Sequence, residues 1–223
     1  MYWFEFDIDR NENCLFNDIS NYLDTSKNKM APITIFYHGA CKTFWARAAP
    51  IILTLDHVGA EYSIKDTSEA PEGCGFAVPM VILEDGQHLS QTVAITMALG
   101  DKYGLVGKTA QEKNVCLQTM LDLNDLLIEI KPGTLKEKPE RLLKWKSVFE
   151  SRLQDSFFGG EEVSVADFFA ETVFTFINFK FGDNYDDFPK LTKWMKSIVD
   201  VPAVKKMRAS GIDIIPPFMK NKN

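Results

Sequence analysis

The polar pair Gln91-Thr92 stands where apolar spacing predicts the start of a helix, directly after a hairpin signal. The first N–H groups of a helix have no partner within the helix, and the helix dipole favours a negative charge there. Thr92 adds a hydroxyl and Gln91 a side-chain amide, so the pair could hold a carboxylate beside an ammonium group. A threonine at a helix start is more often only a cap. The pair therefore makes a candidate anion site.

Pro79 directly precedes a predicted strand, Met80 to Leu83, and Asp85-Gly86 supplies a strong turn signal for a hairpin after it. Proline has no N–H for a sheet ladder, so it is poorly suited to a buried strand. It could simply be an edge-strand proline. In thioredoxin-like sheets, however, a cis-proline at this place turns the preceding backbone outward, where it can pair with an extended, peptide-like ligand. Val78 would be the pairing residue.

A second polar pair, Ser164 and Asp167, has the spacing of a capping box with Asp in place of Glu. It precedes a strongly apolar segment, 165–179, which we expect to be a central helix. The predicted role of this pair is structural rather than catalytic.

The composition excludes several classes of protein. The 223 residues are 45% hydrophobic and 25% charged, as in ordinary globular proteins, and the net charge of −6 with a pI of about 5.2 argues against nucleic acid or anionic membrane as the main partner. Four cysteines without a CxxC pair and three histidines without ligand spacing favour reduced thiols and no metal site. No apolar run reaches the length of a membrane span, and the acidic N-terminus resembles neither a secretory signal nor a transit peptide. We expect a cytoplasmic protein.

Two kinds of organisation follow one another along the chain. After a hard-to-place segment, 1–30, the order is β-α-β, loop, β-β-α, which predicts a small mixed sheet with helices packed against it. Beyond Gly107 only helical patterns occur. We therefore expect an N-terminal extension (1–30), an α/β domain (31–103) and an all-α domain (110–223). The expected strands are 33–37, 61–64 and the hairpin 78–89, and the expected helices are 44–57 (late or kinked at Pro50), 91–102, 111–130, 142–158, 165–179, 191–199 and 204–207.

Four stretches together resemble the cytosolic glutathione transferases. They are VPMVILEDGQHLSQTVAI, GLVGKT, the SVADFF helix start and FPKLTKWMKSIVDVPAVKKM, and the resemblance covers about residues 33–211. The spacing is most similar to the sigma and mu classes. The resemblance implies a thioredoxin-like N-terminal domain and an all-helical C-terminal domain. It also implies conjugation of glutathione to hydrophobic electrophiles, as in detoxification, by a homodimer that needs no metal.

The resemblance also implies a glutathione site. Val78, ahead of cis-Pro79, would pair with the cysteinyl unit, and Gln91 and Thr92 would hold the γ-glutamyl end. Asp125 would reach the γ-glutamyl ammonium of a neighbouring subunit, unless it is only a solvated helix carboxylate.

Three residues are candidates for stabilising the glutathione thiolate, which is the nucleophile in such enzymes. Tyrosine-using classes place the donor where Tyr37 ends the first strand, although the usual Arg-Gly-Arg pattern is absent here. Serine-using classes place a hydroxyl at the next helix start, where Thr43 stands. Cys41 matches classes with a cysteine there, which would favour thiol exchange. Tyr37 is preferred, with Cys41 and Thr43 as alternatives.

The segment between Tyr62 and Pro79 is shorter than in the family and contains Lys65 as its only cation. The family uses a helix and basic or Trp residues there to grip the glycyl carboxylate, so Lys65 is a weak substitute. A second hypothesis follows, in which the protein is a non-catalytic or weakly catalytic binding or structural module on a transferase fold.

Overall fold

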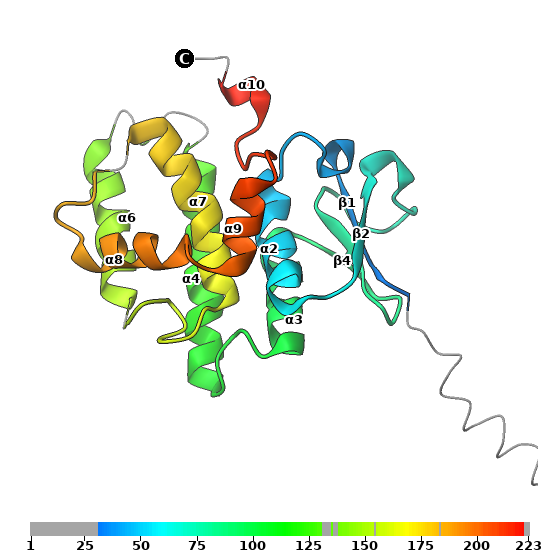
Figure 1. Ribbon diagram of the computed structural model, residues 1–223, viewed down its shortest axis with the longest axis horizontal. Coiled ribbons are helices and arrows are strands. Elements are labelled where there is room, and N and C mark those ends of the chain that lie inside the picture. Colours follow the sequence, from blue (N-terminus) through cyan, green and yellow to red (C-terminus); the bar gives the residue numbers. More distant parts are fainter. Residues whose placement is uncertain (1–30, 131–134, 136–137, 154, 183, 221–223) are drawn as a thin grey trace, which may run out of the picture. The chain divides into compact units, whose positions relative to one another are not determined.

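The run ITIFY forms the first strand, β1 (Ile33–Tyr37), in the computed structural model, which describes residues 31–130, 135, 138–153, 155–182 and 184–220 (Figure 1). Its β-branched and aromatic side chains suit a strand that is buried on both faces. The predicted extension, 1–30, lies outside the described residues. Residues 32–223 form one compact unit, so the predicted boundary between 103 and 110 remains a prediction.

β1 is central in a four-stranded sheet of order β2-β1-β3-β4. β2 (Tyr62–Asp66) runs parallel to β1, whereas β3 (Met80–Ile82) and β4 (His88–Ser90) form the predicted antiparallel hairpin. The hairpin turn is held by the Asp85 carboxylate, which accepts from the Gln87 N–H at 2.9 Å. The predicted β-α-β, β-β-α order is confirmed.

Two helices join this sheet to the rest of the protein. α2 (Ala49–Val58) and α3 (Thr92–Tyr103) pack against each other, and they also contact helices of the C-terminal half. Figure 1 shows them between the sheet and those helices. α2 begins late, as predicted, with Pro50 in its first turn, where the missing N–H costs nothing.

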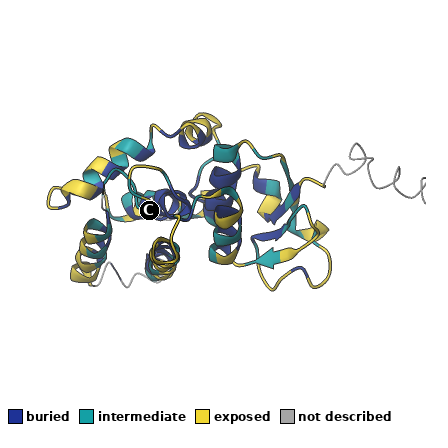
Figure 2. Ribbon diagram, turned by 90° about the horizontal axis from the view of Figure 1, so that it is seen from below, coloured by how far each residue is buried: buried dark blue, intermediate teal, exposed yellow. Residues whose placement is uncertain are grey.

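The C-terminal half is entirely helical in its described residues. α7 (Val165–Phe181) is the central helix, and nearly all of its first thirteen residues are buried. Figure 2 shows how buried residues (dark blue) alternate with exposed ones (yellow) around the helices. It packs against α4, α2 and α8. No helix in the described part of the chain is both long and apolar enough to cross a membrane. The other helices are α4 (Ala110–Ile130), α6 (Pro139–Arg152), α8 (Pro189–Ile198), α9 (Pro202–Ala209) and α10 (Pro217–Lys220).

The Ser164–Asp167 pair forms at the start of α7, as predicted, and it does more than cap the helix. The Asp167 carboxylate is fully buried and accepts from the N–H and the hydroxyl of Ser164, at 2.8 and 2.7 Å. It also accepts from the Phe158 N–H at 2.8 Å and from the Trp194 indole at 2.9 Å. Burial raises the pKa of Asp167, and these four donors oppose that rise. One carboxylate therefore joins the start of α7 to α8 and to the loop before α7.

Two expectations about helices were wrong in detail. The helix predicted over 142–158 is α6, which begins at Pro139 and ends at Arg152, because the later residues turn toward Asp167. Thr43 does not stand at a helix start, because the chain first makes a 3₁₀ turn at Ala46–Ala48 and α2 begins only at Ala49.

Together, the mixed sheet and the helical C-terminal half confirm the predicted fold class, a thioredoxin-like domain followed by an all-α domain.

Candidate functional site

The end of β1 and the start of β3 lie side by side. Phe36 is paired with Met80, so the next residues along the two antiparallel strands are Tyr37 and Pro79. The Val78–Pro79 peptide bond is cis, as predicted. Neither the N–H nor the carbonyl of Val78 has a hydrogen-bond partner among the described residues. Val78 therefore offers free backbone groups next to Tyr37.

The start of α3 completes this side of the site. Met80 is also paired with Ser90, which places Gln91 and Thr92 directly beyond the start of β3. Gln91 is exposed and has a φ of 72°, an uncommon conformation for a residue other than glycine. Such conformations gather at ligand sites because they aim backbone groups in directions that ordinary conformations cannot. The N–H groups of Gln91 and Thr92 have no acceptor among the described residues.

The Thr92 side chain differs from its expected arrangement. It is buried, and its hydroxyl donates to the Arg47 carbonyl at 3.2 Å. A hydroxyl has one hydrogen, so in this arrangement it can only accept from a ligand. Of the two donors of Thr92, only the backbone N–H is therefore left to hold an anion.

Arg47 is a residue of this site that the sequence reasoning missed. Its N–H donates to the Tyr37 hydroxyl oxygen at 3.2 Å, and its carbonyl accepts from Thr92. Its guanidinium donates to the Asn124 side chain on α4 at 3.0 Å. One residue thus connects the end of β1, the start of α3 and the helical domain. A cation in the otherwise apolar stretch 44–53 was the signal that could have found it.

Tyr37 has the electrostatics of a neutral donor. Its side chain is only 4% exposed, and burial raises its pKa to about 12, while the Arg47 N–H and charge oppose the rise. The phenol therefore keeps its proton at neutral pH. The hydroxyl oxygen accepts from Arg47, and its hydrogen has no acceptor among the described residues.

The two alternatives to Tyr37 are less suited to this role. Cys41 is 1% exposed, and burial raises the pKa of its thiol to about 12, so it is protonated and shielded. Thr43 is exposed in the turn that follows. The preceding backbone is strained, since Gly39, Ala40 and Cys41 all have φ between 50 and 56°.

Two other predicted residues lie apart from Tyr37. Lys65 is exposed on the edge strand β2 and is paired with Phe36, so it shares the sheet face opposite to Tyr37. Asp125 is exposed on α4, next to the Asn124 that Arg47 contacts. Among the described residues, neither side chain makes a hydrogen bond with Tyr37, Val78 or Thr92.

The shortened segment between β2 and β3 contains one 3₁₀ turn, Thr67–Glu69, and no α-helix. It folds back on the sheet, where Cys74 packs against Phe36 and Met80. This cluster occupies the face on which Lys65 lies. The segment supplies no cation to the Tyr37 side of the sheet.

An aromatic cluster lies beside Tyr37. The ring of Phe44 makes edge contacts with Tyr37 at 6.0 Å and with Phe218 of α10 at 6.4 Å, measured between ring centroids. His38 lies 5.1 Å from Tyr37. The C-terminal segment is fixed here because the Trp45 N–H donates to the Asp213 carbonyl at 2.8 Å. The cluster gives an apolar surface next to a proton donor.

Comparison with known proteins identifies the family. A family model for the glutathione S-transferase C-terminal domain matches residues 116–202. A class-mu 26 kDa glutathione S-transferase (isozyme 51) from Fasciola hepatica is 28% identical over 70% of this chain and 80% of its own length. Glutathione S-transferase A4 from Mus musculus is 31% identical over 63% of this chain and 69% of its own.

A solved structure supports the fold independently. The glutathione S-transferase from Ascaris lumbricoides superposes with a TM-score of 0.66, covering 80% of this chain and 97% of its own at 19% identity. From the sequence relatives and the shared fold together, the chain belongs to the glutathione S-transferase family of enzymes.

Proposed function

We propose that this protein conjugates glutathione to hydrophobic electrophiles and that Tyr37 stabilises the glutathione thiolate. One observation carries the proposal: a neutral, hydrogen-bond-donating phenol lies beside the unpaired backbone of Val78 and the free N–H groups at the start of α3. A peptide-like ligand with a carboxylate at one end and a thiol in the middle fits that combination.

In this proposal the cysteinyl backbone of glutathione pairs with Val78, and the γ-glutamyl carboxylate accepts from the N–H groups of Gln91 and Thr92. The Tyr37 hydroxyl then donates to the sulfur. This stabilises the thiolate and lowers the pKa of the bound thiol below its usual value of about 8.5, so the thiol proton leaves to solvent at neutral pH. The thiolate attacks the electrophile, a carbon–sulfur bond forms, and a leaving group such as chloride departs with the bonding electrons.

Arg47 supports this chemistry by orienting the Tyr37 hydroxyl and by its charge. Its N–H holds the Tyr37 oxygen, which leaves the hydroxyl hydrogen to point to the ligand. Its fixed guanidinium adds positive charge near the developing thiolate. The side chains of Phe44 and Phe218 would form part of the apolar surface for the electrophile.

The active unit in this proposal is a cytoplasmic homodimer. Asp125 is exposed, so it is available to a γ-glutamyl ammonium bound to a neighbouring subunit. Large apolar side chains are also exposed: Phe76 fully, and Leu121 and Ile128 about half, two turns apart on the helix that carries Asp125. A contiguous exposed apolar patch is typical of a face covered by another chain, and we propose that these side chains contribute to such a face in the dimer.

One observation favours the second candidate, a binding module with little catalytic activity. The segment 66–79 contributes no cation to the Tyr37 side of the sheet, which leaves the glycyl carboxylate without a partner there. Glutathione would then bind weakly through its other two units.

Two measurements on the wild-type protein separate these candidates. Calorimetry with glutathione measures binding, and formation of the conjugate with 1-chloro-2,4-dinitrobenzene measures turnover. The proposal expects both to be positive. Binding without turnover would select the binding module, and the absence of both would contradict the glutathione site itself.

A further inference from the structure

The four strands of the sheet place one residue each in a row beside the candidate site. Tyr37 of β1 is paired with Asp66 of β2, and the register of the other strands places Pro79 and Gln91 at the same end of the sheet. In the strand order of the sheet, the row therefore runs from Gln91 through Pro79 and Tyr37 to Asp66. Neighbouring strands lie about 4.8 Å apart, so the row is about 14 Å long.

A thiol tripeptide placed as proposed above would follow this row. Its γ-glutamyl end would lie at Gln91, and its cysteinyl unit at Val78 and Tyr37. An extended tripeptide spans about 11 Å at most, so its third residue would lie over the end of β1, with its C-terminal carboxylate facing the end of β2. That carboxylate is ionised at neutral pH, because the pKa of an α-carboxyl group is about 3.5. The groups at the end of β2 therefore decide how well the third residue binds.

The end of β2 carries a carboxylate on the same sheet face as Tyr37. This residue is Asp66, which shares that face because the side chains of paired residues in adjacent strands lie on one side. Its carboxylate accepts from the Gly39 N–H at 2.8 Å, and from the N–H and hydroxyl of Ser68 at 3.0 and 2.8 Å. These bonds, those from Ser68 above all, hold the pKa of Asp66 below its usual value, so the group is negative at neutral pH. The Gly39 N–H, which could otherwise meet a ligand carboxylate, is already used.

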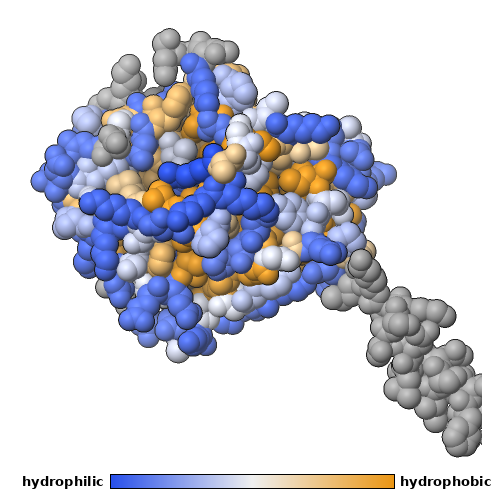
Figure 3. Space-filling model, viewed as in Figure 1, coloured by the Kyte–Doolittle hydropathy of each residue, from blue (hydrophilic) through white to orange (hydrophobic). Residues whose placement is uncertain are grey.

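A second carboxylate lies next to the first. Glu69 is exposed, and its carboxylate accepts from the Asp66 N–H at 3.1 Å. The 3₁₀ turn that contains it, Thr67–Glu69, contacts both β1 and the turn His38–Cys41. Figure 3 shows hydrophilic side chains (blue) along the outer rim of the molecule on the side of the sheet. The third residue of a bound tripeptide would therefore meet two negative charges.

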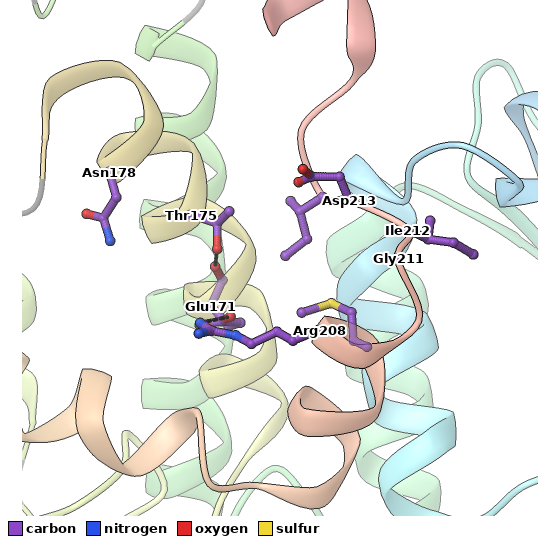
Figure 4. A pocket seen from close by; sticks show the side chains of 9 residues that line it. Glu171, Thr175, Asn178, Arg208, Gly211, Ile212 and Asp213 are labelled. Carbon is purple, nitrogen blue, oxygen red and sulfur yellow. Dashed lines mark hydrogen bonds and ion pairs between the residues drawn. The ribbon is translucent and has the colours of Figure 1, made fainter.

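Cations of the described residues do little to offset these charges. The Arg47 guanidinium is held by a side chain of α4. Arg208 is paired with Glu171 in a hollow beside α7 (Figure 4), and Lys220 is paired with a carboxylate of its own segment. Lys42, which follows the turn 38–41, is exposed and is the nearest cation along the chain. One ammonium group thus stands against two carboxylates.

We propose that the site prefers a γ-glutamyl-cysteinyl thiol whose C-terminal end is uncharged, such as glutathione amide, over glutathione itself. The two molecules differ in one group, because glutathione amide has a carboxamide in place of the glycyl carboxylate. Glutathione binds through its other two units, but its glycyl carboxylate meets Asp66 and Glu69 instead of a cation. This inference rests on the proposed function, because it uses the same positions of Tyr37 and Val78 for the thiol.

The test is calorimetry of the full-length protein with glutathione and with glutathione amide at pH 7.5. Because exposed charges interact only modestly, the amide should bind about twofold to fivefold more tightly at an ionic strength of about 20 mM. Addition of about 0.5 M sodium chloride screens the charges and should reduce the difference to less than about 1.5-fold. Glutathione that binds as tightly as the amide, or more tightly, would overturn this inference and leave the glutathione site intact. Binding of neither probe would overturn both.

Variants locate the preference. Glu69→Gln keeps an oxygen for the Asp66 N–H but removes one charge, so it should narrow the difference between the two probes. Asp66→Asn/Glu69→Gln removes both charges and should bring the probes within about 1.5-fold of each other. Glu140→Gln/Asp186→Asn makes the same change of charge at exposed positions in the C-terminal half and should leave the difference as in the wild type. A difference that survives Asp66→Asn/Glu69→Gln or the added salt would contradict the assignment to these two carboxylates.

Discussion

Replacing Ser164 with alanine should destabilise the protein by about 1.5 to 3 kcal/mol, the value of a hydrogen bond to a charged group. The Ser164 side chain is 3% exposed, and its hydroxyl donates to the Asp167 carboxylate at 2.7 Å. The substitution removes only that oxygen, and Asp167 keeps its bonds to the backbone of Ser164 and Phe158 and to Trp194. A simple helix cap would contribute only about 0.5 to 2 kcal/mol, so burial raises the expected cost.

The assay is thermal unfolding followed by circular dichroism. For a domain of this size, 1 kcal/mol corresponds to a shift of about 2 to 4 °C in Tm, so Ser164→Ala should lower Tm by roughly 3 to 12 °C. Ser151→Ala is the matched control, because the Ser151 hydroxyl donates to the Val148 carbonyl at 2.7 Å at an exposed position. That change should shift Tm by less than about 2 °C. Equal shifts for the two variants would refute the argument that the buried carboxylate makes Ser164 important.

Three other predictions concern the candidate site. Thr92→Ala should weaken glutathione binding by about 1 to 3 kcal/mol in calorimetry, because the bond to the Arg47 carbonyl that fixes the start of α3 is lost. Thr92→Ser, which keeps the hydroxyl, should bind like the wild type, and equal weakening in both would refute this role. Cys41 should resist iodoacetamide at pH 8, reacting on the order of 10³-fold more slowly than a free thiol, since burial raises its pKa to about 12. Peptide mapping that finds Cys41 alkylated as fast as an unfolded control would contradict this. Light scattering at micromolar concentration should give a dimer, with Phe76→Ser shifting it toward monomer because an exposed aromatic is lost from the contact. A wild-type monomer would remove the proposed role of Asp125.

Much of the fold is predictable because local patterns and tertiary packing agree. The run Ile33–Tyr37 has the composition of a buried strand and forms one, and Asp85-Gly86 makes the turn its residues favour. Ser164 and Asp167 were found by spacing alone. What spacing does not show is that Phe158 and Trp194 also donate to Asp167, because those contacts join distant parts of the chain.

The candidate site was less predictable, because some of its contacts also join residues that are distant in the sequence. Val78, Pro79 and Thr92 could be predicted as candidates because they lie on one hairpin and the helix after it, where sequence distance and spatial distance are both short. Arg47 was missed because its importance lies in a backbone N–H that meets Tyr37 across a strained turn. Thr43 was misplaced because three left-handed residues and Pro50 delay the helix expected there.

The pH dependence of conjugation in wild type and Tyr37→Phe tests whether Tyr37 stabilises the glutathione thiolate. The assay uses 1-chloro-2,4-dinitrobenzene, with glutathione binding measured in parallel by calorimetry. Because the pKa of Tyr37 is about 12, the phenol stays protonated from pH 6 to 9 and can donate throughout that range. Loss of a hydrogen bond to a charged sulfur, about 1.5 to 3 kcal/mol, should raise the pKa of the bound thiol and slow conjugation tenfold to a hundredfold at pH 7.

We expect Tyr37→Phe still to bind glutathione, and its rate to approach the wild-type rate as the pH rises above the pKa of the free thiol, where solvent deprotonates the thiol without help. Cys41→Ser and Thr43→Val should keep wild-type profiles. A Tyr37→Phe profile that coincides with the wild type, while Cys41→Ser abolishes activity, would show that Tyr37 does not stabilise the thiolate and would point to thiol exchange.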